Sequence, residues 1–419
     1  MRILYTIVLF LMLPFVLLRL LWRSRLALAY RERWGERFGK VRGPYRQGGL
    51  WVHAVSVGEV LAVAPLVRHL IQNHPSLHIH ITTTTPTGSA QVQRLFGVEV
   101  SHSYAPYDIP LFLMRFLDTL RPKAMLMVET EVWPNLLHYA REREVTTLLA
   151  NARLSARSLK RYQRVESFAQ TVFAQIDHVA AQTETDADRL RMIGVNPGAI
   201  HVTGSIKFDV DVPASVLEQS EVMRRMWSGR PVWVAGSTHD GEESVILEAH
   251  QQLVKEVPDA LLILVPRHPE RFDAVGSLAE RYDFEVARRS LHDPVTEKTQ
   301  IYLGDTMGEL NVLIGAVNVA FIGGSFAKIG GHNVLEAAAQ GIPVIVGPHT
   351  FNFELITRQL IQIGGAERVY NADELAALLQ VWLTDAAARV EVGEAGQKLV
   401  ADNRGALDKL EKLVEKIIA

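Results

Sequence analysis

The sequence contains no cysteine and has almost no net charge of either sign. Without cysteine, the 419-residue chain can form neither disulfide bonds nor thiolate metal sites. Its 44 basic and 46 acidic residues give a formal net charge of −2, whereas nucleic-acid-binding domains usually carry a clear basic excess. We therefore expect no nucleic-acid partner, and the length allows two or three domains.

Charged residues are also missing from the segment 3–18 near the N-terminus. A membrane-spanning helix needs about 20 apolar residues, and the run reaches this length if it continues to Trp22 while Arg19 extends its charge toward the headgroups. The segment lacks a small-residue cleavage site, which argues against a cleaved signal peptide. We expect a retained signal-anchor, with a helix lying in the membrane interface as the alternative.

A basic segment follows this apolar run, with only Glu32 and Glu36 as acids. By the positive-inside rule, it places the rest of the chain in the cytoplasm, and it should attract the anionic headgroups of membrane lipid. The basic residues are Arg19, Arg23, Arg25, Arg31, Arg33, Arg37, Lys40, Arg42 and Arg46.

From residue 50 onward, short apolar strands alternate with amphipathic helices, a pattern typical of parallel sheets covered on both faces. One helix is expected over 158–175. The segment 209–213 is a plausible linker, so we predict two Rossmann-like domains with ligands beyond the carboxyl ends of the strands, in the cleft between the halves. The predicted parts are an anchor (1–22), a basic segment (23–49), domains at 50–209 and 214–395, and a C-terminal amphipathic helix (396–419).

The most informative stretch is 318–348, in which a strand runs into Gly323-Gly324-Ser325 and a loop leads to Asn333 and Glu336. Glycines let a ligand approach the backbone, and free amides at a helix start attract phosphate. Asn333 and Glu336 face the same side of the first turn, where a carboxylate could bind a sugar diol. The pair could equally be an ordinary helix cap, so both interpretations stay open.

Four charged residues follow strands or end the first half. Glu59 opens a helix after the first strand and suits a general base, although Ser56 and Glu59 also fit a capping box. Glu129 and Glu131 follow the strand 124–128 and would share a side if it continued. Acids in such a position are costly unless hydrogen-bonded or functional. Lys207 could meet an anionic ligand or be a solvated lysine.

In the second half, Arg267 follows a strand and could bind phosphate or pair with Glu270. The stretches 236–243 and 305–310 could bind an anion or a base edge through their backbone, or simply cap helices. His74, His78 and His80 suggest a metal cluster, but we favour ordinary surface or partly buried histidines.

Seven motifs occur in a fixed order and together resemble those of the 3-deoxy-D-manno-octulosonic acid (Kdo) transferases of Gram-negative lipopolysaccharide synthesis. The resemblance covers nearly the whole chain, including the N-terminal anchor. The motifs are HAVSVGE, VETEVWPN, TGSIKFD, AGSTHDGEE, VPRHPER, DTMGEL and GGSFAKIGGHNVLEAAAQGIPVIVGPHTFNF.

The resemblance implies an inner-membrane glycosyltransferase of the GT-B class, with two Rossmann-like domains facing a cleft behind an N-terminal membrane-anchor helix. It would move Kdo from CMP-Kdo to a lipid A precursor (lipid IVA) with inversion and without metal or cofactor. The first half would bind the acceptor and the second half CMP. Alternatives are a GT-B transferase with another nucleotide sugar and a non-catalytic nucleotide-binding module.

The same resemblance assigns roles to individual residues. Glu59 would be the base, and Glu131 and Lys207 would assist at the transition state. CMP would be held by Pro266, Arg267, Met307, Gly308, Glu309, Asn333, Val334, Leu335 and Glu336.

Overall fold

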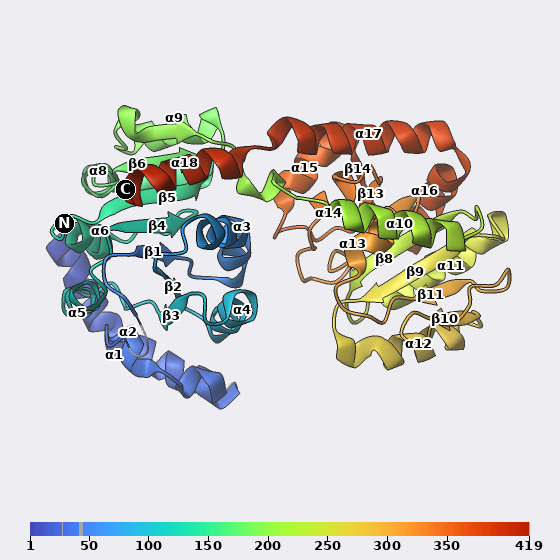
Figure 1. The fold of residues 1–419 in the computed structure, drawn as a ribbon, viewed down its shortest axis with the longest axis horizontal. Coiled ribbons are helices and arrows are strands. Elements are labelled where there is room, and N and C mark those ends of the chain that lie inside the picture. Colours follow the sequence, from blue (N-terminus) through green and yellow to red (C-terminus); the bar gives the residue numbers. More distant parts are fainter. Residues whose placement is uncertain (27, 42–44, 419) are drawn as a thin grey trace. The chain divides into compact units, whose positions relative to one another are not determined.

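A computed structural model of the chain describes residues 1–26, 28–41 and 45–418, so Arg42 of the basic segment lies outside the described residues. The chain forms two compact units. Unit 1 contains Met1–Asp209 and Arg404–Ala419, and unit 2 contains Val210–Asn403. Each unit is built on its own seven-stranded parallel sheet with helices on both faces (Figure 1).

The sheet of unit 1 has the strand order β3-β2-β1-β4-β5-β6-β7. Its first and fourth strands are therefore neighbours at the point where the winding reverses, which is where α/β sheets usually bind ligands. The strands are β1 (Leu50–His53), β2 (Ile79–Thr83), β3 (Ser101–Tyr104), β4 (Ala124–Val128), β5 (Thr146–Ala152), β6 (His178–Ala181) and β7 (Ile200–Val202).

Alternating side chains of these strands supply two cores, one on each face of the sheet. Trp51 packs into one core and its neighbours Leu50 and Val52 into the other, as the two-residue period of a strand requires. The first core is covered by α5 (Pro110–Leu120), α6 (Pro134–Arg141), α8 (Glu166–Phe173) and α9 (Glu184–Met192). The second is covered by α3 (Val57–Asn73), α4 (Pro86–Phe96) and α18 (Ala406–Ile418).

The sheet of unit 2 has the order β10-β11-β9-β8-β12-β13-β14, so its winding reverses between β8 and β12. The strands are β8 (Val232–Thr238), β9 (Leu261–Pro266), β10 (Val286–Arg288), β11 (Ile301–Leu303), β12 (Val319–Ile322), β13 (Val344–Val346) and β14 (Ala366–Arg368). Its helices are α10 (Ala214–Met226), α11 (Glu243–Glu256), α12 (Phe272–Arg281), α13 (Leu310–Gly315), α14 (Leu335–Ala338), α15 (Glu354–Gln362), α16 (Ala372–Thr384) and α17 (Ala386–Asn403).

Two helices differ from their expected extents. The single helix expected over 158–175 is two helices, α7 (Ala156–Gln163) and α8, because the chain leaves helical geometry at Val165. The C-terminal part is also divided: α17 belongs to unit 2, and α18 returns to unit 1. Asp209 caps α18, because its carboxylate accepts hydrogen bonds of 2.6 Å from the amides of Gly405 and Leu407.

The apolar N-terminal segment is one helix, α1 (Arg2–Leu26), long and apolar enough to cross a membrane. Only 6% of its most apolar window is buried, so its large side chains face outward. Its first turn is nevertheless attached to unit 1: Tyr5 donates a 2.9 Å hydrogen bond to Asp108, and Thr6 a 3.0 Å bond to Asn135.

The basic segment after α1 is attached to unit 1 as well. The guanidinium of Arg33 donates to the carbonyl of His102 at 2.9 Å, on the edge strand β3. Glu36 accepts the backbone amide of Tyr104 at 2.8 Å. Both ends of α1 are thus close in sequence to residues that contact the same unit.

Candidate functional site

The carboxyl ends of β1 and β4 bring together the charged residues that were singled out in the first half. Ser56 caps α3 by accepting a hydrogen bond from the amide of Glu59. The Glu59 carboxylate turns back and accepts from the Val55 amide at 2.6 Å and from the Ser56 hydroxyl at 2.8 Å. The capping interpretation of this pair is therefore correct as a description of its contacts.

Capping does not account for the electrostatics of Glu59, which is only 7% exposed. Its pKa is raised to about 7, first by burial and then by the nearby charges of Glu131 and Glu129, against the two hydrogen bonds that lower it. A carboxyl that titrates near neutral pH is partly ionised there, and its carboxylate form is basic enough to accept a proton. The geometry therefore allows Glu59 to act as a base as well as a cap.

Glu131 lies in the segment between β4 and α6 and accepts a 2.9 Å hydrogen bond from the indole of Trp133. Its pKa is also raised, first by burial and then by Glu129. The strand does not continue through these acids: β4 ends at Val128 and Glu129 has a φ of 60°. They reach one site through a turn, not through the alternation of a strand.

Lys207 lies in the short 3-10 helix Ile206–Phe208 and forms an ion pair of 3.2 Å with Glu129. It is not an unpartnered solvated lysine. The pair brings a cation to the acids at the end of β4. The sequence pattern grouped Glu129 only with Glu131 and gave no sign of its pairing with Lys207.

In unit 2, Arg267 follows β9, and its backbone amide donates to the carbonyl of Thr238. In the described part of the chain, its guanidinium has no hydrogen bond or ion pair, so the expected alternative of a pair with Glu270 is wrong. The neighbouring Arg271 is the paired residue, with the carboxylates of Glu243 and Asp240. Arg267 is thus a cation available to a ligand.

Asn333 and Glu336 are joined by a 3.1 Å hydrogen bond, and Asn333 also accepts from the amide of Leu335. Burial raises the pKa of Glu336, while the positive charge of Arg267 opposes this shift. Pro266, Val334 and Leu335 are buried and can contribute only backbone groups to a ligand. The positive charge of Arg267 therefore acts on the segment 333–336.

The third predicted CMP segment follows β11. Met307 is exposed, Gly308 has a φ of 88°, and Glu309 accepts hydrogen bonds of 2.7 and 3.0 Å from Arg289. This pairing, rather than a contact with Arg267, holds Glu309 in place and lowers its pKa. The exposed methionine and the glycine leave the backbone accessible.

Sequence reasoning missed three histidines in the same motifs: His239, His268 and His332. The Nε2 atoms of His239 and His332 are 2.8 Å apart, and their stacked rings have centroids separated by 5.0 Å. His268 meets His239 edge-on with a centroid distance of 5.3 Å. One histidine follows β8, one follows β9 and one precedes α14. Because the carboxyl ends of neighbouring parallel strands lie at one edge of a sheet, this positioning could have predicted that the three histidines lie close together.

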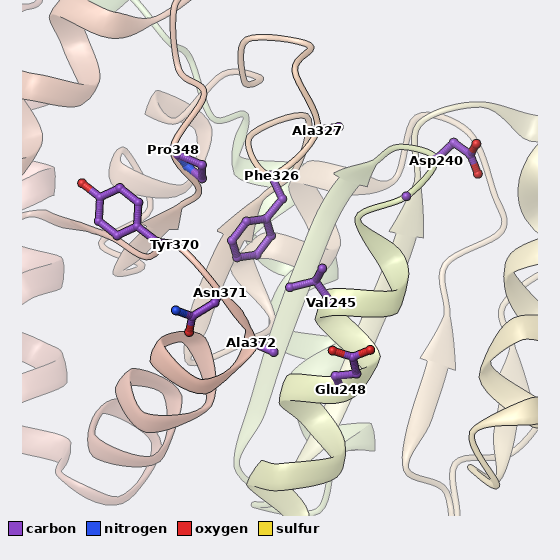
Figure 2. Close-up of a pocket in the computed structure, with 10 residues that line it drawn as sticks. Asp240, Val245, Glu248, Phe326, Ala327, Pro348, Tyr370, Asn371 and Ala372 are labelled. Atoms are coloured by element: carbon purple, nitrogen blue, oxygen red, sulfur yellow. The ribbon is translucent and has the colours of Figure 1, made fainter.

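A pocket of about 450 Å³ lies elsewhere in unit 2, against α11 and the start of α16 (Figure 2). None of the predicted CMP-binding residues lines it. Its lining contains the acids Asp240 and Glu248 and no lysine, arginine or histidine. This lining therefore offers no positive charge to an anionic ligand, in contrast to the segment that carries Arg267.

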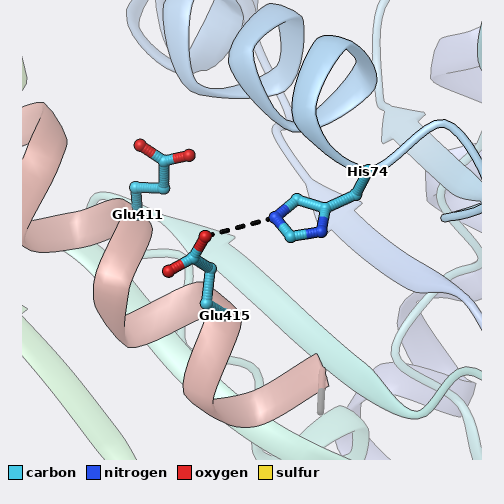
Figure 3. Close-up of side chains that lie close together, drawn as sticks. All are labelled: His74, Glu411 and Glu415. Carbon is cyan, nitrogen blue, oxygen red and sulfur yellow. Dashed lines mark hydrogen bonds and ion pairs between the residues drawn. The ribbon is translucent and has the colours of Figure 1, made fainter.

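One group of described residues could hold a metal ion, on the surface of unit 1. Ligand atoms of His74, Glu411 and Glu415 lie within 4.8 Å of one another, between α3 and α18 (Figure 3). In the structure, His74 pairs with Glu415 at 3.2 Å, and these contacts tie α18 to α3. His78 and His80 do not join His74; they contact the hydroxyl of Ser101 on β3.

The two parallel-sheet units match solved glycosyltransferase structures. A glycosyltransferase from Rickettsia africae superposes with a TM-score of 0.53, covering 89% of this chain and 99% of that one at 13% identity. The fold is that of the GT-B class.

Sequence relatives narrow this class to one family. The 3-deoxy-D-manno-octulosonic acid transferase of Haemophilus influenzae is 42% identical over 419 residues, 99% of this chain and 98% of the relative. That of Bordetella pertussis is 38% identical over 93% of this chain and 95% of the relative. The family described as 3-Deoxy-D-manno-octulosonic-acid transferase (kdotransferase) matches residues 32–210. The chain belongs to the Kdo transferase family.

Proposed function

We propose that the protein is a glycosyltransferase that moves Kdo from CMP-Kdo to a lipid A precursor such as lipid IVA, in lipopolysaccharide core synthesis. Unit 1 would bind the acceptor and unit 2 the donor. The observation that carries the proposal is Glu59, a buried carboxyl whose pKa is about 7, in a chain that belongs to the Kdo transferase family.

The reaction we propose is a single displacement. Glu59 takes the proton from an acceptor hydroxyl while that oxygen forms a bond to the anomeric carbon of Kdo. The bond between this carbon and the phosphate oxygen breaks at the same time, and CMP leaves with the electron pair. One displacement inverts the configuration of the anomeric carbon. A base with a pKa near the working pH is best suited to such a transfer.

Glu131 and Lys207 would act on the positive charge that develops on the sugar as CMP departs. A partly buried carboxylate near the anomeric carbon stabilises an oxocarbenium-like transition state through its negative charge. Lys207, which forms a 3.2 Å ion pair with the neighbouring Glu129, offers a cation to the donor carboxylate.

On the donor side, Arg267 is the cation that we expect to bind the phosphate, with the backbone of 307–309 and 333–336 around the nucleotide. CMP has one phosphate, so less negative charge must be neutralised than in a nucleoside-diphosphate donor. We therefore propose that the reaction needs no metal. Activity that persists after dialysis against EDTA is the expected result; loss of activity that Mg²⁺ restores would reject this part.

We propose that the protein works at the cytoplasmic face of the bacterial inner membrane, with α1 lying in the interface. A helix of 25 residues is about 37 Å long, enough to cross the bilayer. Yet Tyr5 at its start and Arg33 beyond its end contact the same unit, and a crossing helix would separate them. The outward side chains Phe10, Phe15 and Trp22, each more than 60% exposed, would enter the lipid.

The decisive experiment is transfer by the detergent-solubilised protein with CMP-Kdo and lipid IVA, with products identified by mass spectrometry. The expected product is heavier than lipid IVA by a whole number of Kdo residues. Turnover of UDP-sugars without turnover of CMP-Kdo would reject the donor. CMP binding without any transfer would leave only a nucleotide-binding module.

A further inference from the structure

The imidazoles of His239, His268 and His332 come from three separate loops and gather at the carboxyl ends of β8 and β9. Such a gathering requires space, and Gly324 provides it. A Cβ atom on Gly324 would lie 3.1 Å from the ring of His332 and 3.5 Å from that of His239, at a φ of 68°. A side chain at position 324 would press on both rings, so the backbone here is matched to the histidine pair.

The rings face positive groups and no carboxylate within ion-pair distance among the described residues. Besides burial, His239 is influenced by His268, Arg267 and Arg271, and His332 is influenced by His239, Arg267 and His268. Burial, followed by these charges, lowers the pKa of His239, and it lowers that of His332 to about 4. In the free protein, both rings are therefore neutral near pH 7.

The acids on the surrounding elements are already engaged. The carboxylate of Glu242 accepts the amides of His239 at 2.7 Å and Gly324 at 2.6 Å. Glu243 and Asp240 bind Arg271. Glu336 on α14 is held by Asn333. In the described part of the chain, no carboxylate forms an ion pair with these imidazoles or with the guanidinium of Arg267.

Two neutral imidazoles 2.8 Å apart share a single hydrogen bond, in which one Nε2 carries the proton and the other accepts it. An oxyanion that enters between them would need an N–H from each ring. Each neutral ring can present that N–H as its Nε2–H tautomer, but the negative charge of the anion favours the imidazolium form, so one ring gains a proton from solvent.

We propose that His239 and His332, together with Arg267, bind an oxyanion of the donor, and that donor binding is coupled to the uptake of one proton by this pair. The oxyanion is either the phosphate or the sugar carboxylate of CMP-Kdo. The inference rests on the proposed function, since it takes CMP-Kdo as the ligand. The two histidines would position the donor and neutralise part of its charge, and they would become positively charged only when the donor is bound.

Calorimetric titration of the full chain with CMP, in buffers of different ionisation enthalpy, counts the protons directly. At pH 7.0 the phosphate of CMP, with a second pKa of about 6, is mostly a dianion, so binding of the dianion releases at most about 0.1 proton. We expect an uptake of about 0.5–1 proton per CMP if the phosphate is the bound group. A second titration uses CMP-Kdo with the Glu59→Gln variant, which should bind the donor without transferring Kdo. If protons are taken up with CMP-Kdo but not with CMP, the bound group is the sugar carboxylate.

Variants and controls separate the possible outcomes. His332→Gln should reduce the uptake to below about 0.2 proton and weaken binding about tenfold. His138→Gln, which changes a histidine of unit 1 paired with Glu142, should leave both unchanged. Tight binding of both ligands without proton uptake by the unmodified protein would overturn the inference alone. Absence of binding by both CMP and CMP-Kdo would overturn the donor assignment and this inference with it.

Discussion

The two units place opposite kinds of titratable group at the same topological position. Where the winding reverses in unit 1, between β1 and β4, the structure has Glu59 and Glu131, whose pKa values are raised. At the corresponding reversal in unit 2, between β8 and β12, it has His239 and His332, whose pKa values are lowered. Burial is the first cause of each of these four shifts.

Burial brings the titratable groups of both sites closer to electrical neutrality. Desolvation disfavours the charged form of either group, so the acid in unit 1 gains protons and the imidazoles in unit 2 lose them. An acid near its pKa can serve as a base, whereas neutral imidazoles can acquire charge with an anion. Similar folds thus support different chemistry through the side chains at one position.

Glu59→Gln should have the largest effect, because it removes the only proton acceptor that we assign. We expect transfer to fall by about 10²–10⁴-fold, while the affinity for CMP stays within about twofold. Initial rates of lipid IVA glycosylation and calorimetric CMP titration measure the two quantities. The control is Glu184→Gln, an exposed glutamate in the first turn of α9. Near-normal turnover of Glu59→Gln would remove Glu59 as the base.

Arg267→Ala tests the other side of the comparison, the cationic donor site. A charged hydrogen bond contributes about 1.5–3 kcal/mol, so CMP affinity should fall by about 10- to 100-fold. The matched control is Arg281→Ala, an exposed arginine in the last turn of α12. If both variants bind CMP as tightly as the unmodified protein, Arg267 has no role in holding the phosphate.

The sequence predicts the fold and the residue types of the site better than it predicts their partners. Strand periodicity and the order of elements lead to two parallel sheets, because buried parallel strands are continuously apolar. Lys207 and Arg267 could not be told apart by local sequence. Lys207 is ion-paired, whereas the Arg267 guanidinium has no ion pair with any residue that the structure describes, and this depends on which loops the sheet order brings together.

The histidine pair shows the same limit more clearly. His239 and His332 are 93 residues apart and belong to different motifs, so no local spacing connects them. The break at Val165 has a related cause: the apolar spacing of 158–175 suits one helix, but α8 alone packs buried residues into the core while α7 buries none. Tertiary packing, not propensity, decides both.

The pH dependence of turnover separates the two sites further. Because the pKa of Glu59 is about 7 and the base must be ionised, kcat/KM should rise about tenfold per pH unit below pH 7 and level off above it. Measuring kcat/KM for the acceptor at saturating donor separates this rise below pH 7 from any proton uptake by the histidines during donor binding. A profile that is flat between pH 5.5 and about 8 would contradict a base with this pKa.

The smallest effect concerns the free energy of unfolding. The raised pKa of Glu59 destabilises the folded state at high pH, where the buried carboxyl must ionise. Glu59 has a higher pKa in the folded protein, about 7, than in the unfolded chain, so the folded state binds more protons between about pH 4.5 and 7. The stability that Glu59 contributes is fully present below its unfolded pKa and is lost as the pH rises through 7. Glu59→Gln, which cannot ionise, should keep it.

Chemical denaturation at pH 5 and pH 8 measures this difference. We expect the free energy of unfolding of Glu59→Gln, relative to the unmodified protein, to increase by about 2 kcal/mol between the two pH values. The Glu184→Gln control should show no such change, because that residue is exposed. An equal pH dependence for all three proteins would mean that Glu59 is ionised at no cost in the folded state. The contrast between a neutralised acid in unit 1 and neutral imidazoles in unit 2 would then be lost.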